Sequence, residues 1–267
     1  MKKILLLIPF FTLLSFIQQE QYYITFIKGT VLVERTGKPV KIGEILLPTD
    51  KLVFKNNSAR LACISPGKGR FDISPVKSNN NSSGELIAVL KNILLPISKT
   101  YHLSTRSLLF NGYDPKTYFN CEETQNRILL LTDKPLPLLS SYNPDPNNFF
   151  FVQYIEDGKT ITRKIVQSEK GLLFSNSLFM EGTVIRIPKK VMICYQEKDA
   201  SGAHSSVLAE IIPVLSSVSE IRQQILLITK YSSSTDTKNL NKEIMAHIYD
   251  NYGKIGSEEI ANLSKQQ

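Results

Sequence analysis

The sequence predicts a mainly β protein of the α+β class whose chain ends in α-helices. Three observations predict it. Between residue 22 and residue 215, short runs of alternating apolar and polar residues are separated by turn residues. Asp157 and Gly158 lie between two such runs, as the two-residue turn of a hairpin does. After residue 216 the apolar spacing changes to the period of a helix.

Composition and charge limit the classes of function. Hydrophobic residues make up 42% of the 267 residues, which is enough for one or two cores. The chain has 32 Lys and Arg against 24 Asp and Glu. These cations are scattered, and the densest group is the Lys189-Lys190 pair. A surface that follows nucleic-acid phosphates needs clustered cations interleaved with aromatic residues, so the sequence predicts no nucleic-acid partner.

Residues 1–18 have the layout of a secretory signal peptide. Lys2 and Lys3 precede a mostly apolar run from Ile4 to Ile17, and polar residues follow it directly. The run is shorter than the roughly 20 apolar residues of a spanning helix, and it contains Pro9. We therefore expect a periplasmic or extracellular protein with no stable transmembrane anchor after leader removal.

Residues 22–76 predict a small, curled β-module. Apolar residues alternate at period two, which places each pair on one face of a half-buried sheet. The pairs are Val31 and Val33, Leu52 and Phe54, and Leu61 and Cys63. Gly37, Gly43 and the Asn56-Asn57 pair separate the runs, where turns need such residues.

The pattern of this module resembles the FecR-type β-domain. The matching residues are Gly29, Val31, Val33, Gly37, Val40, Gly43, Leu46, Asp50, Leu52, Ser58, Ala59, Leu61, Gly69 and Phe71. Members of that family are periplasmic sensors that relay a signal across the inner membrane, so the resemblance implies a fold and an envelope location. The family's cytoplasmic segment and spanning helix find no counterpart here. With its leader, the chain is also similar to uncharacterised exported proteins of Bacteroidetes-type bacteria.

A linking helix is expected over residues 83–95. Ser82 and Glu85 form a capping box, and Pro96 ends the helix. Its apolar stripe consists of Leu86, Val89, Leu90 and Ile93. We expect this helix to cover one face of the first module.

Residues 100–215 predict a second β-rich domain, an immunoglobulin-like or related β-sandwich. Asp114 and Pro115 begin a short helix, residues 127–133 form a strand, and residues 149–166 form the hairpin that turns at Asp157 and Gly158. Several strands with turn signals between them are typical of such sandwiches. The chain contains no Trp, so the core Trp of antibody-type domains is absent.

Residues 216–267 predict a helical C-terminal region. Ser217 caps a first helix that ends near Tyr231, Gly253 ends a second helix, and Ser257 begins a third. We expect their apolar stripes to pack on the sandwich, since amphipathic helices usually face their own core. Contact with a partner is the alternative.

Residues 64–71, with the sequence ISPGKGRF, place two glycines around Lys68, as some phosphate-binding loops do. A Walker-type loop requires a following helix, and the dinucleotide motif requires a third glycine where Asp72 stands. Strand-like runs flank this segment on both sides. It therefore predicts a hairpin tip with Lys68 and Arg70 in solvent, available to an anionic surface such as lipid headgroups or glycan.

The sequence predicts no catalytic residue, metal ligand or cofactor. Ser65 and Lys68 match the S-x-x-K motif, but Pro66 and Gly67 prevent the helix that this motif needs. None of the histidines has a ligand partner at zinc spacing. They are His102, His204 and His247. The adjacent acids diverge in either a strand or a helix and indicate solvated charge. They are Glu122 with Glu123, and Glu258 with Glu259.

Three cysteines are far apart in the sequence. Cys63 and Cys194 lie in strand-like runs and are interpreted as buried, inert thiols. Cys121 is the third, and a single bridge between two of the three remains an alternative in an oxidising compartment.

Three consecutive phenylalanines at residues 149–151 are the remaining indication of a contact surface. Alternation along a strand sends Phe150 to one face and Phe149 and Phe151 to the other. We favour burial of all three inside the sandwich and under the C-terminal helices. A binding platform made by Phe149 and Phe151 is the alternative.

These observations favour a non-enzymatic binding or structural protein of the bacterial cell envelope. Its partner would be an envelope protein or a glycan. Two alternatives stay open. One is an enzyme that acts on glycan or cell-wall material and has converging carboxylates or a His-centred site, and the other is the extracytoplasmic sensory part of a signalling system.

The leader predicts cleavage close to Gln18, and Ser15 is the alternative position. Expressed with a C-terminal tag in a Gram-negative host, the exported chain should begin near residue 19, as N-terminal sequencing and intact mass will show. A Leu6→Arg variant breaks the apolar run, so it should stay uncleaved and unexported. An exported chain that still begins at Met1 would contradict the assignment.

Overall fold

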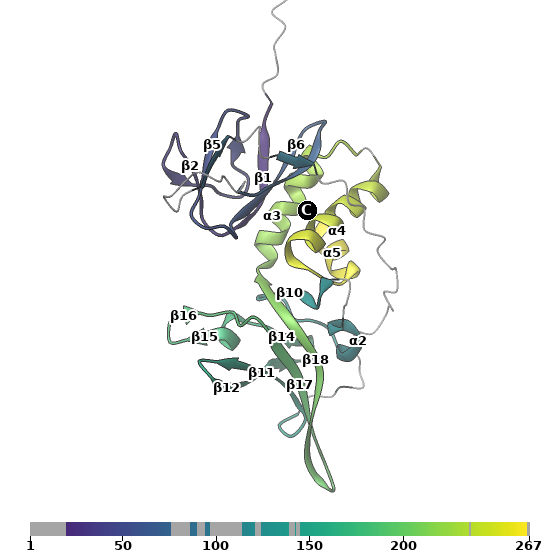
Figure 1. Ribbon diagram of the computed structural model, residues 1–267. Coiled ribbons are helices and arrows are strands. Elements are labelled where there is room, and N and C mark those ends of the chain that lie inside the picture. The colour runs from purple at the N-terminus through teal and green to yellow at the C-terminus, as the bar shows by residue number, and fades with distance from the viewer. Residues whose placement is uncertain are drawn as a thin grey trace, which may run out of the picture.

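The computed structural model describes residues 20–75, 86–89, 94–96, 114–120, 124–138, 142, 145–234 and 236–265. Within these residues the chain is mainly β with helices at its C-terminal end, as the sequence predicts (Figure 1). The expected signal peptide, His102, Cys121 and the Glu122-Glu123 pair lie outside the described residues. No helix in the described part of the chain combines the length and apolarity needed to cross a membrane.

Two antiparallel sheets form the first module. The first sheet has the order β4-β1-β6-β7-β9, and the second has the order β3-β2-β5-β8. The strands are β1 (Tyr22–Lys28), β2 (Val31–Val33), β3 (Lys38–Pro39), β4 (Ile45–Leu46), β5 (Lys51–Phe54), β6 (Arg60–Ser65), β7 (Gly69–Ile73), β8 (Leu86–Val89) and β9 (Leu94–Pro96). Apolar side chains from both sheets share one core, which includes all three alternating pairs identified in the sequence. The expected strands and turns of this module are confirmed.

The expected helix over residues 83–95 is wrong. Leu86–Val89 forms strand β8, antiparallel to β5, and Leu94–Pro96 forms strand β9, antiparallel to β7. Short apolar runs of this kind suit a strand as well as a helix, and their spacing alone does not distinguish the two. Strands β5 and β7 provide backbone groups that an extended segment can pair with, so tertiary pairing outweighs the helical spacing.

Strand β6 is buried on both faces. Leu61 and Cys63 face the core of the first module, whereas Ala62 and Ile64 point the other way, into a second core. A bulge in β1 after Ile24 turns Phe26 to that same side. The first sheet therefore separates two cores, and its outer face needs a cover.

Three helices provide this cover: α3 (Val218–Tyr231), α4 (Thr237–Tyr252) and α5 (Ser257–Lys265). Ser217 caps α3 as predicted, because its side chain accepts a hydrogen bond from the Glu220 N–H. The apolar side chains of the helices pack on the outer face of the first sheet and on Leu129, Leu131 and Val214 of the second region. Packing of the helices on their own chain is thus confirmed, but most of the covered surface belongs to the first module (Figure 1).

A mixed five-stranded sheet with the order β10-β18-β17-β11-β12 dominates the second region. Its strands are β10 (Arg127–Leu131), β11 (Phe149–Glu156), β12 (Lys159–Lys164), β17 (Val191–Asp199) and β18 (Gly202–Ser216). Strand β10 is parallel to β18, and the other pairs are antiparallel. The remaining elements are α2 (Pro115–Phe119), the 3-10 helix η2 (Asn176–Phe179), and two hairpins, β13 (Val166–Ser168) with β14 (Gly171–Leu173) and β15 (Met180–Glu181) with β16 (Val184–Ile185).

Several local predictions for this region are confirmed. Asp114 caps α2, with Pro115 at its first position. Asp157 and Gly158 have φ values of 48° and 74° in the turn between β11 and β12, as a two-residue hairpin turn requires. The immunoglobulin-like assignment stays a prediction, since the described strands form one mixed sheet and two small hairpins.

Strand β10 joins the helices to the second sheet. Ile128 and Leu130 face the core of that sheet, and Leu129 and Leu131 face the helices. At the edge of β10 the Lys254 N–H donates to the Arg127 carbonyl and the Leu129 N–H donates to the Lys254 carbonyl, both at 2.8 Å. The segment after α4 therefore extends the sheet.

Gly253 permits this close approach, and its replacement tests it. Gly253→Ala and Gly158→Ala both place a side chain at positive φ, 96° and 74° respectively, which costs about 1–2 kcal/mol in the left-handed helical region. The ψ of −156° at residue 253 belongs to a region that is essentially confined to glycine, so the backbone adds to the cost there. Only the Cβ at residue 253 would overlap the Arg127 carbonyl, whereas nothing lies within 4 Å of a Cβ at residue 158. We expect Gly253→Ala to lower the free energy of unfolding by about 1–3 kcal/mol more, measured by urea denaturation. Equal losses would contradict the close approach.

Candidate functional site

The hairpin tip predicted from ISPGKGRF is confirmed. Strands β6 and β7 flank it, and the Lys68 N–H donates to the Ser65 carbonyl at 3.1 Å. Gly67 and Gly69 have positive φ values of 72° and 84°, which explains the two glycines. The Lys68 side chain is exposed, as expected, and forms an ion pair with Glu20.

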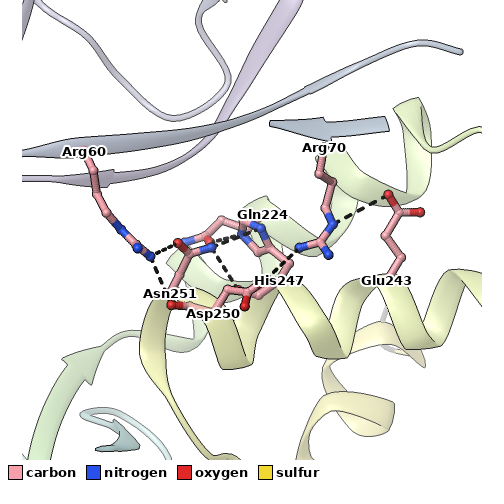
Figure 2. A network of polar contacts seen from close by, with 7 residues as sticks. All are labelled: Arg60, Arg70, Gln224, Glu243, His247, Asp250 and Asn251. Carbon is pink, nitrogen blue, oxygen red and sulfur yellow. Dashed lines mark hydrogen bonds and ion pairs between the residues drawn. The ribbon is translucent and has the colours of Figure 1, made fainter. Parts of the chain in front are cut away.

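The expectation that Arg70 lies in solvent is wrong, since only 5% of its side chain is exposed. Phe71 faces the core of the first module, so alternation along β7 turns Arg70 to the outer face of the sheet, which α4 covers. Arg70 Nε lies 3.8 Å from Glu243 Oε1, and Arg70 Nη1 lies 3.5 Å from Asp250 Oδ2. Figure 2 shows this guanidinium between the two carboxylates of the helix.

Arg60 is a second cation on the same face of the sheet. Its Nη2 donates to the Asp250 carbonyl at 3.0 Å and to Asn251 Oδ1 at 2.6 Å. Two arginines on neighbouring strands thus meet the polar side of α4 (Figure 2). Both contacts bridge segments that lie far apart in the sequence, so they fix how the helices lie on the first module.

A hydrogen-bond relay continues from Arg60 into the helical layer. Asn251 Nδ2 donates to His247 Nδ1 at 3.2 Å, and His247 Nε2 donates to Gln224 Oε1 at 2.9 Å. Gln224 Nε2 then donates to the Tyr252 hydroxyl, which donates to Glu220 Oε1 at 3.1 Å. The relay runs from the Arg60 cation to the Glu220 anion, and each side chain between them both donates and accepts. Hydrogen bonds arranged in this way polarise one another.

His247 is held in its neutral form. Burial lowers its pKa to about 3, and the positive charges of Arg70 and Arg60 act in the same direction. The hydrogen bonds agree with this, because Nδ1 accepts while Nε2 donates. A proton on Nδ1 would face the donating amide of Asn251. His247 therefore acts as a buried neutral connector between α3 and α4.

The sequence contained a signal for this polar cluster, although the cluster corresponds to no metal-binding or catalytic motif. The residues that face the arginines lie at positions i, i+4, i+7 and i+8 of one helix, and they therefore share a face. They are Glu243, His247, Asp250 and Asn251. A polar stripe beside the apolar stripe of α4 indicates charged partners on the surface that the helix covers.

Glu259 also differs from the prediction of solvated charge. Its side chain is buried, it accepts a hydrogen bond from the Tyr118 hydroxyl at 3.2 Å, and burial raises its pKa. Its neighbour Glu258 is exposed, as expected. Because α5 lies against α3, Glu259 turns inward towards α2. This contact ties the last helix to the second region.

A serine, a histidine and an aspartate meet at the tip of the β17–β18 hairpin. Ser201 Oγ lies 2.8 Å from His204 Nε2 and donates to Asp199 Oδ1 at 2.6 Å. Asp199 approaches the same nitrogen of His204 at 3.6 Å. In a catalytic triad the acid orients the other ring nitrogen, and the acid is buried. Here all three residues are exposed, so this group is a surface turn.

Cys63 and Cys194 are free and buried, as favoured from the sequence. Burial raises the pKa of both thiols, which keeps them protonated and unreactive. Within the described residues, no group of three or more His, Cys, Asp or Glu side chains could hold a metal ion.

Phe149 and Phe151 lie on the second sheet, on the face opposite to its core. Phe150 is fully buried in that core, while its two neighbours are only half-buried. The ring centroids of Phe149 and Phe151 are 6.2 Å apart, and Lys164 Nζ lies 4.0 Å from the centroid of Phe149. The expected cover by the C-terminal helices is wrong for this pair, because those helices pack on the first sheet and on β10.

Cross-strand register shows which residues share this face with the two phenylalanines. Phe151 pairs with Cys194, which pairs with Val207 on the next strand. Ile155 lies on the same side of β11, where it pairs with Thr160. Val207 is 59% exposed and Ile155 is 71% exposed. We call Phe149, Phe151, Ile155, Met192 and Val207 the outer sheet face; Cys194 lies among them on the same side but is buried.

The state of His247 predicts how stability depends on pH. In the fold its pKa is about 3, against an ordinary value of 6.5, so the unfolded chain binds more protons between these values. The stabilisation that depends on a neutral His247 is fully present above the ordinary pKa of 6.5. It is lost as the pH falls towards the pKa of about 3 in the folded chain. The slope approaches about 1.4 kcal/mol per pH unit.

Chemical denaturation at about pH 7 and about pH 5 measures this slope. We expect His247→Gln to lose less stability on acidification than the wild-type chain, because glutamine cannot be protonated there. The comparison also removes every pH-dependent contribution that the two chains share. A wild-type slope in His247→Gln would exclude a buried neutral imidazole.

Comparison with protein-family models, with curated proteins and with solved structures finds no match to this chain. The FecR-type assignment therefore stays a prediction that rests on the turn glycines and alternating apolar residues of the first module. The outer sheet face, which sequence alternation and strand register bring together, is the candidate contact surface.

Proposed function

We propose that this chain is an exported, non-enzymatic binding or structural protein of a bacterial cell envelope, and that the outer sheet face is its contact surface. The leader supports the location. The observation that carries the binding role is the pair of incompletely buried phenylalanines, Phe149 and Phe151, on the face that also exposes Ile155 and Val207. Within this proposal, the first module has the FecR-type fold and the second region an immunoglobulin-like fold.

The composition of the outer sheet face supports contact with a protein. Aromatic residues and Met are enriched in the centres of protein interfaces, and here Phe149, Phe151 and Met192 lie on adjacent strands. Gln153 lies between Phe151 and Ile155 on the same side of β11 and donates to Thr162 Oγ1 at 3.3 Å. The face thus combines apolar surface with polar groups that bind a partner in a defined orientation.

The cationic hairpin tip is less well supported as a contact surface. Arg70 is directed to Glu243 and Asp250 on α4, so it stabilises the fold. Lys68 remains exposed, but it forms an ion pair with Glu20. One lysine provides little affinity for lipid headgroups, since each such cation contributes only about 1 kcal/mol.

His247 and Glu259 are side chains of the kinds that catalysis uses, but their contacts in the fold support a structural role for both. His247 lies in a relay between two helices, and Glu259 bonds to Tyr118 beneath α5. Both are buried at packing interfaces between elements of the chain. Their hydrogen-bond partners satisfy them within the fold, and this favours binding over catalysis as the function.

Replacement of both phenylalanines tests the contact surface. The tagged mature chain is incubated with detergent extracts of its native envelope, and the captured components are measured by quantitative mass spectrometry. The double variant Phe149→Ser with Phe151→Ser should lose at least roughly tenfold of its specific partner, because truncation of central aromatic residues typically costs more than 1 kcal/mol of binding.

Leu226→Ser is the matched control. Leu226 is an exposed apolar residue on α3, away from the outer sheet face, so its replacement should leave capture unchanged. Circular dichroism and the unfolding midpoint establish that all variants fold. Undiminished capture by the double variant, or turnover of cell-wall glycan by the purified chain, would contradict the proposed function.

A further inference from the structure

Strand β12 ends the second sheet with one side unpaired. In the described part of the chain β12 pairs only with β11. The Ile165 N–H donates to the Phe150 carbonyl at 2.9 Å, which fixes the hydrogen-bonding parity of the pair. In an antiparallel ladder alternate residues bond inward, so the residues between them direct their N–H and C=O groups outward. The outward residues are Thr160, Thr162 and Lys164.

The opposite edge of the same sheet shows how the fold closes an edge. There the segment at Lys254 bonds to Arg127 and Leu129 of strand β10. Strand β12 has no such cover among the described residues, contains no proline and keeps a regular register with β11 over all six of its residues. It therefore presents a straight row of backbone donors and acceptors, which is the template for addition of a further strand.

Charge on this edge determines which strand it would accept. The segment KTITRK contains Lys159, Arg163 and Lys164 and no acidic residue. Lys164 is exposed and projects on the outer side with Thr160 and Thr162. Acidic side chains on an added strand would lie beside this side of the edge. A second copy of β12 would instead bring like charges together, which disfavours self-pairing.

The inner side of the edge is different. Arg163 turns inward, and its Nη2 donates to the Met180 carbonyl at 2.9 Å, which holds the β15–β16 hairpin beside β12. Arg186 ties the same hairpin to the β11–β12 turn, with its Nη1 4.0 Å from Asp157 Oδ2. This hairpin and the residues that follow it expose Val184, Ile185 and Ile187. An added strand would have apolar neighbours on this side.

We propose that the β12 edge binds an extended segment of a partner protein, in which acidic residues alternate with apolar ones, as a further strand of the second sheet. The proposal rests on the binding role proposed above and names the partner's chemistry. Backbone hydrogen bonds supply the affinity. The acidic side chains face Lys164, and the apolar side chains face the β15–β16 hairpin.

A peptide probe tests the edge directly. A short fluorescent peptide that alternates valine with glutamate is titrated into the purified mature chain, and binding is followed by fluorescence anisotropy. We expect saturable binding that weakens as salt is added. Thr162→Pro should weaken it at least tenfold, because proline removes one outward N–H yet is tolerated on an edge strand. Thr162→Ala, which keeps that N–H and likewise loses the hydroxyl, should bind as the wild type does.

A charge exchange provides a second measurement that does not depend on proline. Lys164→Glu should weaken binding of the valine–glutamate peptide and strengthen binding of a valine–lysine peptide. The proposal is overturned if Thr162→Pro folds and binds like Thr162→Ala. It is equally overturned if the wild-type chain binds neither peptide, since the lysines then only protect the edge from association.

The two proposals fail in different ways. Envelope capture that is lost with the phenylalanine double variant but kept with Thr162→Pro overturns the edge and supports the outer sheet face. If envelope capture is lost with Thr162→Pro and kept with Thr162→Ala, the result supports strand addition. Peptide binding by the single variant Phe151→Ser, which keeps Phe149 beneath Lys164, should stay at the wild-type level and assign the peptide to the edge. Loss of binding in that variant would place the peptide on the outer sheet face instead.

Discussion

Contact between two arginines of the first module and the polar side of α4 is the constraint on which the arrangement of this molecule depends. A buried guanidinium is tolerated only where carboxylates and carbonyls compensate its charge, and removing one partner of such a pair costs about 3–5 kcal/mol. Arg70 finds Glu243 and Asp250, and Arg60 finds Asn251 and a helix carbonyl. A helix shifted by one turn would leave both cations uncompensated, so these contacts select one register from the many that apolar packing alone would allow.

The position of the helices explains which surfaces remain for function. Because α3 and α4 cover the outer face of the first sheet, and the segment after α4 closes the β10 edge, the helical layer is used within the fold. Beyond Leu129, Leu131 and Val214, which the helices contact, the far side of the second sheet and its β12 edge have no equivalent cover in the described part of the chain. Both proposals therefore concern surfaces at the end of the sheet opposite to the helices (Figure 1).

Local signals in the sequence predicted local structure well. The turn at Asp157 and Gly158, the hairpin tip at Lys68 and the caps of α2 and α3 all depend on residues within a few positions of one another. Part of the candidate site could also be predicted from the sequence, because alternation along a strand places Phe149 and Phe151 on one face. The position of Val207 beside them could not be predicted in this way, because it follows only from the register of three strands. The run of consecutive apolar residues over Leu61, Ala62, Cys63 and Ile64 was a sequence signal of a strand covered on both faces.

By itself the sequence determined the turns and, for α3 and α4, the helix ends and apolar stripes, because steric restriction of φ and ψ and side-chain capping act within one segment. Tertiary structure decided whether residues 86–89 and 94–96 pair as strands, where the charge of Arg70 lies and which phenylalanines stay incompletely buried. Each of these outcomes depends on a segment distant in sequence that supplies a backbone partner, a carboxylate or a cover. Only the folded chain brings those segments together.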